Sequence, residues 1–173
     1  MRIVMIFDQI QSGLGGKENS MLALGGKKMK IGSANMIDSY LREFDGEIVA
    51  CLYCGDGFFK DNREEVSMKL MRMCLKLKAE VVICGPAFNY EGYGEMCGYL
   101  AKYIQENTSI NTIAAMSKEC KDTIESYKEK ISIVKMPRKG GTGLTNSLSV
   151  LGELASLKYK SENTTDFESE YCY

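Results

Sequence analysis

The residues best suited to chemistry gather in three glycine-bearing stretches. They are Ser12-Gly13-Leu14-Gly15-Gly16-Lys17, Cys54-Gly55-Asp56-Gly57-Phe58-Phe59 and Gly85-Pro86-Ala87-Phe88-Asn89-Tyr90-Glu91-Gly92-Tyr93-Gly94. Glycine lets backbone N–H groups approach an anion, whereas aromatic faces attract quaternary ammonium groups. The aromatic side chains have a second interpretation, as anchors that fix the loops to the core. Because the chain has no histidine, acid–base chemistry must come from Asp, Glu, Lys, Tyr or Cys.

Two glycine-rich segments are candidate anion sites, and the second of them lies outside the three stretches above. The first, residues 12–17, superficially resembles a phosphate-binding loop, but it has neither a Gly-Lys-Ser/Thr ending nor a Gly-x-Gly-x-x-Gly before a helix. We therefore favour a flexible or substrate-covering loop. The second is Lys139-Gly140-Gly141-Thr142 at the start of the last predicted helix, where free N–H groups would meet a carboxylate or phosphate. Plain helix capping by Thr142 explains it equally well.

Cys51 and Cys54 have the C-x-x-C spacing of redox motifs, but both fall at the end of a predicted strand. Residues three apart in a strand point to opposite faces, so neither a dithiol nor a zinc site is expected. We predict that Cys51 lies in the core and Cys54 at the rim. Cys54 would be a reactive thiol if nearby cations or N–H groups lowered its pKa. No cofactor and no metal ion is expected.

Five apolar segments of strand length alternate with helical patterns. The predicted strands cover residues 2–7, 47–53, 81–84, 111–115 and 130–135, and Gly85 with Pro86 ends the third. Residues 63–76 are typical of an amphipathic helix, since Val66, Leu70 and Cys74 recur at helical spacing. We therefore predict an α/β fold: a three-layer, doubly wound, mostly parallel five-stranded sheet with helices on both faces.

The predicted domain covers residues 1–158, and residues 159–173 are expected to form a polar, acidic tail without regular structure. Residues 8–33 form an unusually long polar and glycine-rich connection, which is typical of a functional or mobile loop. In a doubly wound sheet, ligands bind outside the carboxyl ends of the strands. The loops that follow the strands are therefore expected to make one binding rim.

Composition narrows the class of protein. The chain has 22 basic and 23 acidic residues, so it lacks the basic excess that nucleic acids or anionic lipids would require. The apolar start of the chain ends at Asp8, far short of a membrane span. Seven cysteines, an odd number with no secretory leader before them, indicate reduced thiols and a cytoplasmic protein.

The glycine-bearing loops together resemble a known family, the B component of the glycine, sarcosine and betaine reductases. The motifs are Gly13-Leu14-Gly15-Gly16 with Glu18, Cys54-Gly55-Asp56 followed by Phe59, and Gly85-Pro86-Ala87-Phe88-Asn89 with Tyr93-Gly94 and Cys97-Gly98. The resemblance is to the family's amino-terminal half. It implies recognition of an amine, whose C–N bond is cleaved reductively through a selenocysteine in the carboxyl-terminal half. That region is not expected in this chain.

The resemblance implies that the chain binds a small zwitterionic amine or amino acid, as a subunit or divergent homologue completed by other reductase subunits, including a selenoprotein. Glu18 or Asp56 would meet the cation. N–H groups after Gly15 and Gly85 would hold the carboxylate, which Asn89 orients. The expected contacts also include Gly16, Gly55, Pro86, Ala87, Phe88 and Tyr93, with Cys54 as the thiol for any redox step. The alternative is a non-catalytic regulatory or scaffolding module that binds a nucleotide or a protein partner at the same rim.

Overall fold

The centre of the fold is a six-stranded sheet with the order β2-β3-β1-β4-β5-β6 in the computed structural model, which describes residues 1–173. The strands are β1 (Arg2–Phe7), β2 (Gly25–Lys27), β3 (Glu47–Tyr53), β4 (Val81–Ala87), β5 (Asn111–Ser117) and β6 (Ile133–Met136). All pairings are parallel except that of β2 with β3. The predicted α/β fold with a mostly parallel sheet is confirmed.

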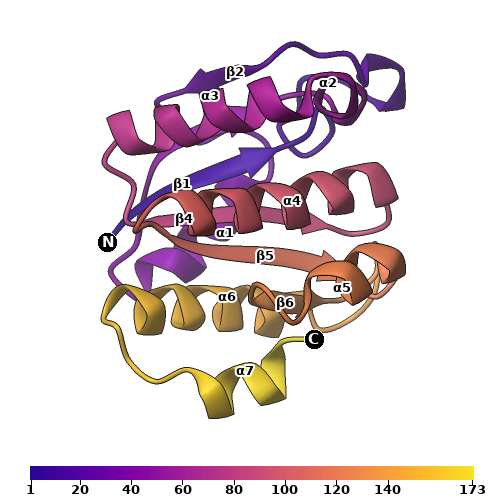
Figure 1. Cartoon of the computed structure of the whole chain (residues 1–173). Coiled ribbons are helices and arrows are strands. Elements are labelled where there is room, and N and C mark those ends of the chain that lie inside the picture. The colour runs from indigo at the N-terminus through magenta and orange to yellow at the C-terminus, as the bar shows by residue number, and fades with distance from the viewer.

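Helices cover both faces of the sheet, which gives three layers (Figure 1). They are α1 (Ala34–Arg42), α2 (Asp56–Asp61), α3 (Arg63–Lys76), α4 (Glu91–Asn107), α5 (Lys121–Tyr127), α6 (Leu144–Tyr159) and α7 (Thr165–Tyr171), with a 3-10 turn, η1, at Lys17–Asn19. No helix combines the length and the apolar character needed to cross a membrane.

Side chains of each central strand alternate between two cores. Along β1, Val4 and Ile6 pack with α3, α4 and α5, whereas Ile3, Met5 and Phe7 pack with α1 and α6. All five side chains are completely buried. A strand covered on both faces needs apolar residues at every position, which explains the uninterrupted apolar runs of β1 and β4.

The sixth strand, β2, lies inside the long connection that was expected to have no regular structure. Its three residues, Gly25-Gly26-Lys27, carry no strand signal of their own, and they become a strand by pairing antiparallel with Cys51, Leu52 and Tyr53 of β3. An antiparallel strand at the edge of an otherwise parallel sheet is a common addition to this fold class.

Strand β4 differs from the prediction at its end. Gly85 and Pro86 were expected to stop the strand, but β4 continues through them to Ala87, and all seven of its residues are buried. The pairing with β5 shifts register between Cys84 and Ala87. The interruption therefore changes the register of the strand without ending it, and the loop begins at Phe88.

The segment after Tyr159 also differs from the expected polar tail. It contains α7, whose Phe167 and Tyr171 pack against the α1 and α6 core, and Cys172 pairs with Val134 of β6. Lys158 Nζ of α6 forms an ion pair with Glu168 Oε1 of α7 at 3.1 Å. Phe167 and Tyr171 are one helical turn apart, and this short apolar stripe was hidden by the acidic residues around it.

Candidate functional site

The strand order changes direction at β1. The chain crosses from β1 to β3 on one side and later adds β4, β5 and β6 on the other side. The loops that leave β1 and β4 therefore turn away from each other, which opens a crevice at the carboxyl ends of these two strands. This switch point is the place where a fold of this kind binds its ligand.

A cavity of about 340 Å³, which we call the carboxyl-end cleft, lies at this position. Its lining comes from the loops after β1, β4 and β6 and from α1 and α6: Ile10, Gln11, Met36, Phe88, Asn89, Tyr90, Pro137, Arg138, Lys139, Gly140, Gly141 and Leu144. The volume is near the lower end of the ~300–1,000 Å³ that ligand pockets occupy. The cleft is therefore suited to a small molecule.

The polar side chains that line the cleft include two amides, Gln11 and Asn89, and two cations. Asn89 is exposed, and so are Arg138 and Lys139, neither of which makes an ion pair with an acid of this chain. A guanidinium presents parallel N–H groups that match a carboxylate. Lys139 was expected in an anion site, whereas Arg138 was missed. The sequence feature that could have indicated Arg138 is its position directly before the Lys139-Gly140-Gly141 loop.

Beside the cleft, Gln9 ties the loop after β1 to the start of α2. Its Nε2 donates to Asp56 Oδ1 at 2.9 Å, and the Asp56 backbone N–H donates to Gln9 Oε1 at 3.2 Å. A Cβ added to Gly92 in α4 would lie 2.4 Å from Asp56 Oδ2, so the first turn of α4 closes over this carboxylate. The loops after β3, β1 and β4 thus meet at Asp56.

Asp8, the residue after β1, is a buried carboxylate that was not among the predicted site residues. It is 1% exposed; Oδ1 accepts a 2.6 Å hydrogen bond from the Gln11 N–H, whereas Oδ2 is buried without a partner. Burial, with a smaller effect from the Asp56 charge, raises the pKa of Asp8 to about 6. The sequence feature that could have indicated Asp8 is its position as the first charged residue after a buried strand.

The first glycine-rich loop reaches the rim through its lysine. Glu18 Oε1 accepts a 2.8 Å hydrogen bond from the Gly16 N–H, and the N–H groups of Glu18 itself and of Gly16 lower the pKa of this exposed carboxyl. Lys17 Nζ lies 5.0 Å from the ring centroid of Tyr90. The loop therefore stands beside the cleft, but the Gly16 N–H is already occupied, and Gly15 is exposed.

Several other predicted ligand contacts lie below the surface. Gly55 is buried and its N–H donates to the Leu22 carbonyl at 2.7 Å. Gly85, Pro86 and Ala87 are buried inside β4. Only Phe88 and Asn89 of this motif line the carboxyl-end cleft. The structure therefore places the glycines of both motifs in packing positions.

Tyr93 was expected at the rim, but it lies in the core. Its side chain is completely buried, and its hydroxyl donates to the Ile6 carbonyl at 2.9 Å, which joins α4 to β1. Burial raises the pKa of Tyr93 well above its usual value. Tyr93 thus supports the floor beneath the two loops at the switch point.

Tyr93→Phe should lower the free energy of unfolding by roughly 1–2 kcal/mol, because it removes a buried hydrogen bond without leaving a large cavity. Urea unfolding followed by circular dichroism measures this change. Tyr99→Phe is the matched control, since Tyr99 is partly exposed and its hydroxyl makes no hydrogen bond in the structure. An equal loss in both variants would contradict a specific role for the bond to Ile6.

Cys54 is also buried, not at the rim. It has no exposed surface, and its Sγ lies 3.8 Å from Met96 Sδ. Burial, with smaller effects from the charges of Asp56 and Asp8, raises the pKa of Cys54 to about 12. These surroundings favour the thiol over the reactive thiolate. Cys51 packs in the opposite core, so the two cysteines do face opposite sides of the sheet.

The structure is a doubly wound α/β protein with a cleft of small-molecule size at its strand switch point. Comparison with known proteins gives the family. The chain belongs to the glycine/sarcosine/betaine reductase selenoprotein B family, whose family model matches residues 1–173. No solved structure matches it.

Subunits of reductase complexes share between a quarter and a third of their aligned residues with the chain. It is 27% identical to glycine reductase complex component B subunit gamma of Carboxydothermus hydrogenoformans, over 98% of this chain and 38% of that protein. It is 30% identical to the protein of the same name from Peptoclostridium litorale, over 92% of this chain and 36% of that protein. Sarcosine reductase complex component B subunit beta of Peptoclostridium acidaminophilum is 25% identical, over 94% of this chain and 36% of that protein. The chain thus spans little more than a third of these relatives.

Proposed function

We propose that the chain is the substrate-binding part, or a divergent homologue, of a reductase B component and holds a small zwitterionic amine. The observation that carries the proposal is the carboxyl-end cleft, which combines Arg138, Asn89 and two aromatic side chains at the switch point. The relatives named for glycine and sarcosine reductase support an amino acid or its N-methyl derivative as the ligand class.

In this proposal the two ends of the ligand meet different walls of the cleft. The Arg138 guanidinium binds the carboxylate, and the Asn89 amide orients it. The ammonium group faces the ring of Tyr90, since aromatic faces attract such cations. Lys17 supports this assignment, because its own ammonium group lies over the same ring. Asp8, which accepts a hydrogen bond from the N–H of the lining residue Gln11, and Asp56, which accepts one from Gln9, add negative charge beside the cleft.

The reductive step is assigned to a partner. Cys54 has a raised pKa and is buried, so the chain presents no activated thiol there. We infer that other subunits of a reductase complex, among them a selenoprotein, complete the reaction. All seven cysteines are unpaired, which supports a cytoplasmic location.

Arg138→Ala is expected to weaken binding of sarcosine and betaine by roughly tenfold or more, because it removes the charged carboxylate contact. Isothermal titration calorimetry on the 173-residue chain measures the affinity. Asn89→Ala should weaken it less. Lys160→Ala is the control, since it removes a positive charge at the other end of α6.

Two outcomes would contradict this proposal. One is the absence of heat for glycine, sarcosine and betaine at millimolar concentration. The other is an amine affinity that Arg138→Ala and Asn89→Ala leave at the wild-type value. The second result would move the amine site away from the cleft, and it would favour a scaffolding role for the rim.

A further inference from the structure

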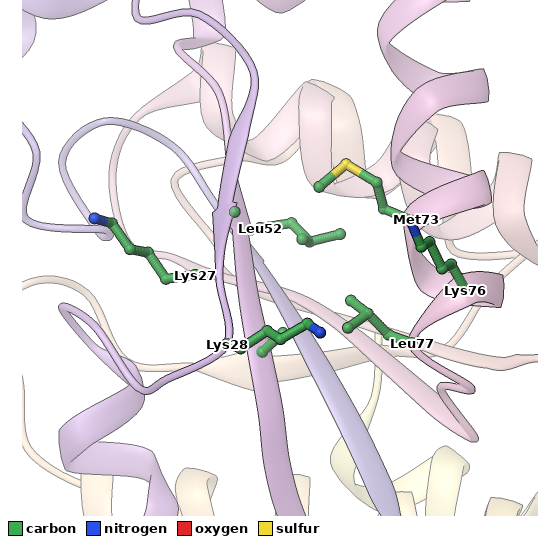
Figure 2. Close-up of a pocket in the computed structure, with 8 residues that line it drawn as sticks. Lys27, Lys28, Leu52, Met73, Lys76 and Leu77 are labelled. Carbon is green, nitrogen blue, oxygen red and sulfur yellow. The ribbon is translucent and has the colours of Figure 1, made fainter.

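A second cavity lies at the β2 edge of the sheet, between β2, β3 and α3. It has a volume of about 320 Å³, and we call it the lysine groove. Figure 2 labels six of the residues that line it: Lys27 in β2, Lys28 directly after β2, Leu52 in β3, Met73 and Lys76 in the last turn of α3, and Leu77 directly after α3. It shares no lining residue with the carboxyl-end cleft. The groove lies at the β2 edge of the sheet, on the face that α3 covers, and it is lined by Leu52 in the carboxyl-terminal half of β3.

The floor of the groove is apolar. Leu52 is buried, and Met73 and Leu77 are half-buried side chains that pack against the same core. In Figure 2 the side chains of Leu52, Met73 and Leu77 converge on the space between β2 and α3. A Cβ added to Gly26 would lie 2.7 Å from Leu52 Cδ2 and 3.1 Å from Met73 Cε. Glycine at this position keeps the strand side of the groove open.

Two lysines without a carboxylate partner, Lys28 and Lys76, border this floor, whereas the Lys27 side chain points away from it in Figure 2. Lys27, Lys28 and Lys76 are exposed and take part in none of the ion pairs of the structure. Seven other basic side chains do have acidic partners: Lys30, Arg42, Arg63, Lys69, Lys102, Lys128 and Lys158. Lys28 and Lys76 therefore place two positive charges without acidic partners at the border of an apolar groove.

We propose that the lysine groove is a docking site for a segment of a partner protein that carries an apolar anchor side chain flanked by carboxylates. The cavity has the size for an anchor residue, which is the usual centre of a protein interface. The unpaired lysines supply the charge complementarity that selects acidic flanks. The sheet is also open here, since β2 has β3 as its only neighbouring strand.

The test uses a fluorescein-labelled synthetic peptide with one leucine between pairs of glutamates, and measures its binding to the 173-residue chain by fluorescence anisotropy. We expect saturable binding that weakens with salt. The double variant Lys28→Glu/Lys76→Glu should weaken it about tenfold or more, since each exposed ion pair is worth up to about fivefold. Lys60→Glu/Lys121→Glu makes the same charge change at exposed, unpaired lysines elsewhere and should preserve the affinity.

Peptides separate the two parts of the proposal. Replacing the leucine by serine should weaken binding if the apolar floor holds an anchor, and replacing the glutamates by lysines should abolish it. Binding that is equal for the acidic and the basic peptide, or equal in the two double variants, would overturn the proposal. Two other occupants would overturn it as well. One is decanoate, if it binds the groove and the peptide does not. The other is a second copy of the chain, if sedimentation shows self-association that Lys28→Glu/Lys76→Glu removes.

Discussion

Asp8→Asn is expected to raise the free energy of unfolding near pH 7.5 by up to roughly 3 kcal/mol, because a carboxyl whose pKa is raised by about two units carries that cost when ionised. Burial raises the pKa of Asp8 from 3.8 to about 6, and its Oδ2 has no partner. Asparagine keeps an acceptor for the Gln11 N–H and removes the buried charge.

The gain should depend on pH. Since the pKa in the folded state lies above that of the unfolded chain, the contribution of Asp8 to stability is fully present below pH 3.8 and is lost as the pH rises through about 6. Wild type and Asp8→Asn should therefore have similar stabilities near pH 4 and differ most above pH 7. Urea unfolding at both pH values measures this, with the exposed Asp61→Asn as control. A difference that is the same at both pH values would contradict a buried, ionising Asp8.

The same variant connects stability to the proposed function. A buried carboxylate without a partner is costly, and groups of this kind are often kept for binding or catalysis at the expense of stability. If Asp8 supplies negative charge behind the cleft, Asp8→Asn should be more stable and bind sarcosine more weakly. If Asp8→Asn gained stability and kept full affinity for sarcosine, Asp8 would have a role in the fold and none in ligand binding.

The layered fold could be predicted because its signals are local. The helix predicted at residues 63–76 begins and ends at the same residues as α3, since its apolar stripe ends where the chain turns into β4. Strand β2 could not be predicted in the same way, because Gly25-Gly26-Lys27 forms a strand only through its contact with β3. Helix α7 was missed because Phe167 and Tyr171 are surrounded by acids.

The burial of the nominated residues was predicted less well than the fold, for a physical reason. Glycines and aromatic residues mark close packing as readily as ligand contact, so Gly55 and Tyr93 were nominated although both are buried. Phe88 and Asn89 do line the cleft. Arg138 was not predicted to line the cleft, because its position there depends on the loop after β6 packing beside the loop after β4, and this long-range contact has no local signal.

Gly85→Ala is expected to lower the free energy of unfolding by roughly 3 kcal/mol or more, because it combines backbone strain with a clash inside the sheet. Gly85 has a φ of 133°, and a Cβ added there would lie 2.4 Å from the carbonyl oxygen of Ala115 in β5. Backbone of a central strand cannot move aside cheaply, since both faces of the sheet are packed. Thermal and urea unfolding of the variant measure the loss.

Gly140→Ala separates the two causes of this loss. Gly140 also has a positive φ, of 73°, but a Cβ there meets nothing within 4 Å. It should therefore cost only about 1 kcal/mol, from backbone strain alone. Equal losses in the two variants would show that the close approach of β4 to β5 is unimportant. If Gly85→Ala kept wild-type stability and lost only amine binding, Gly85 would be a ligand-binding glycine, and its packing against Ala115 would not be its main role.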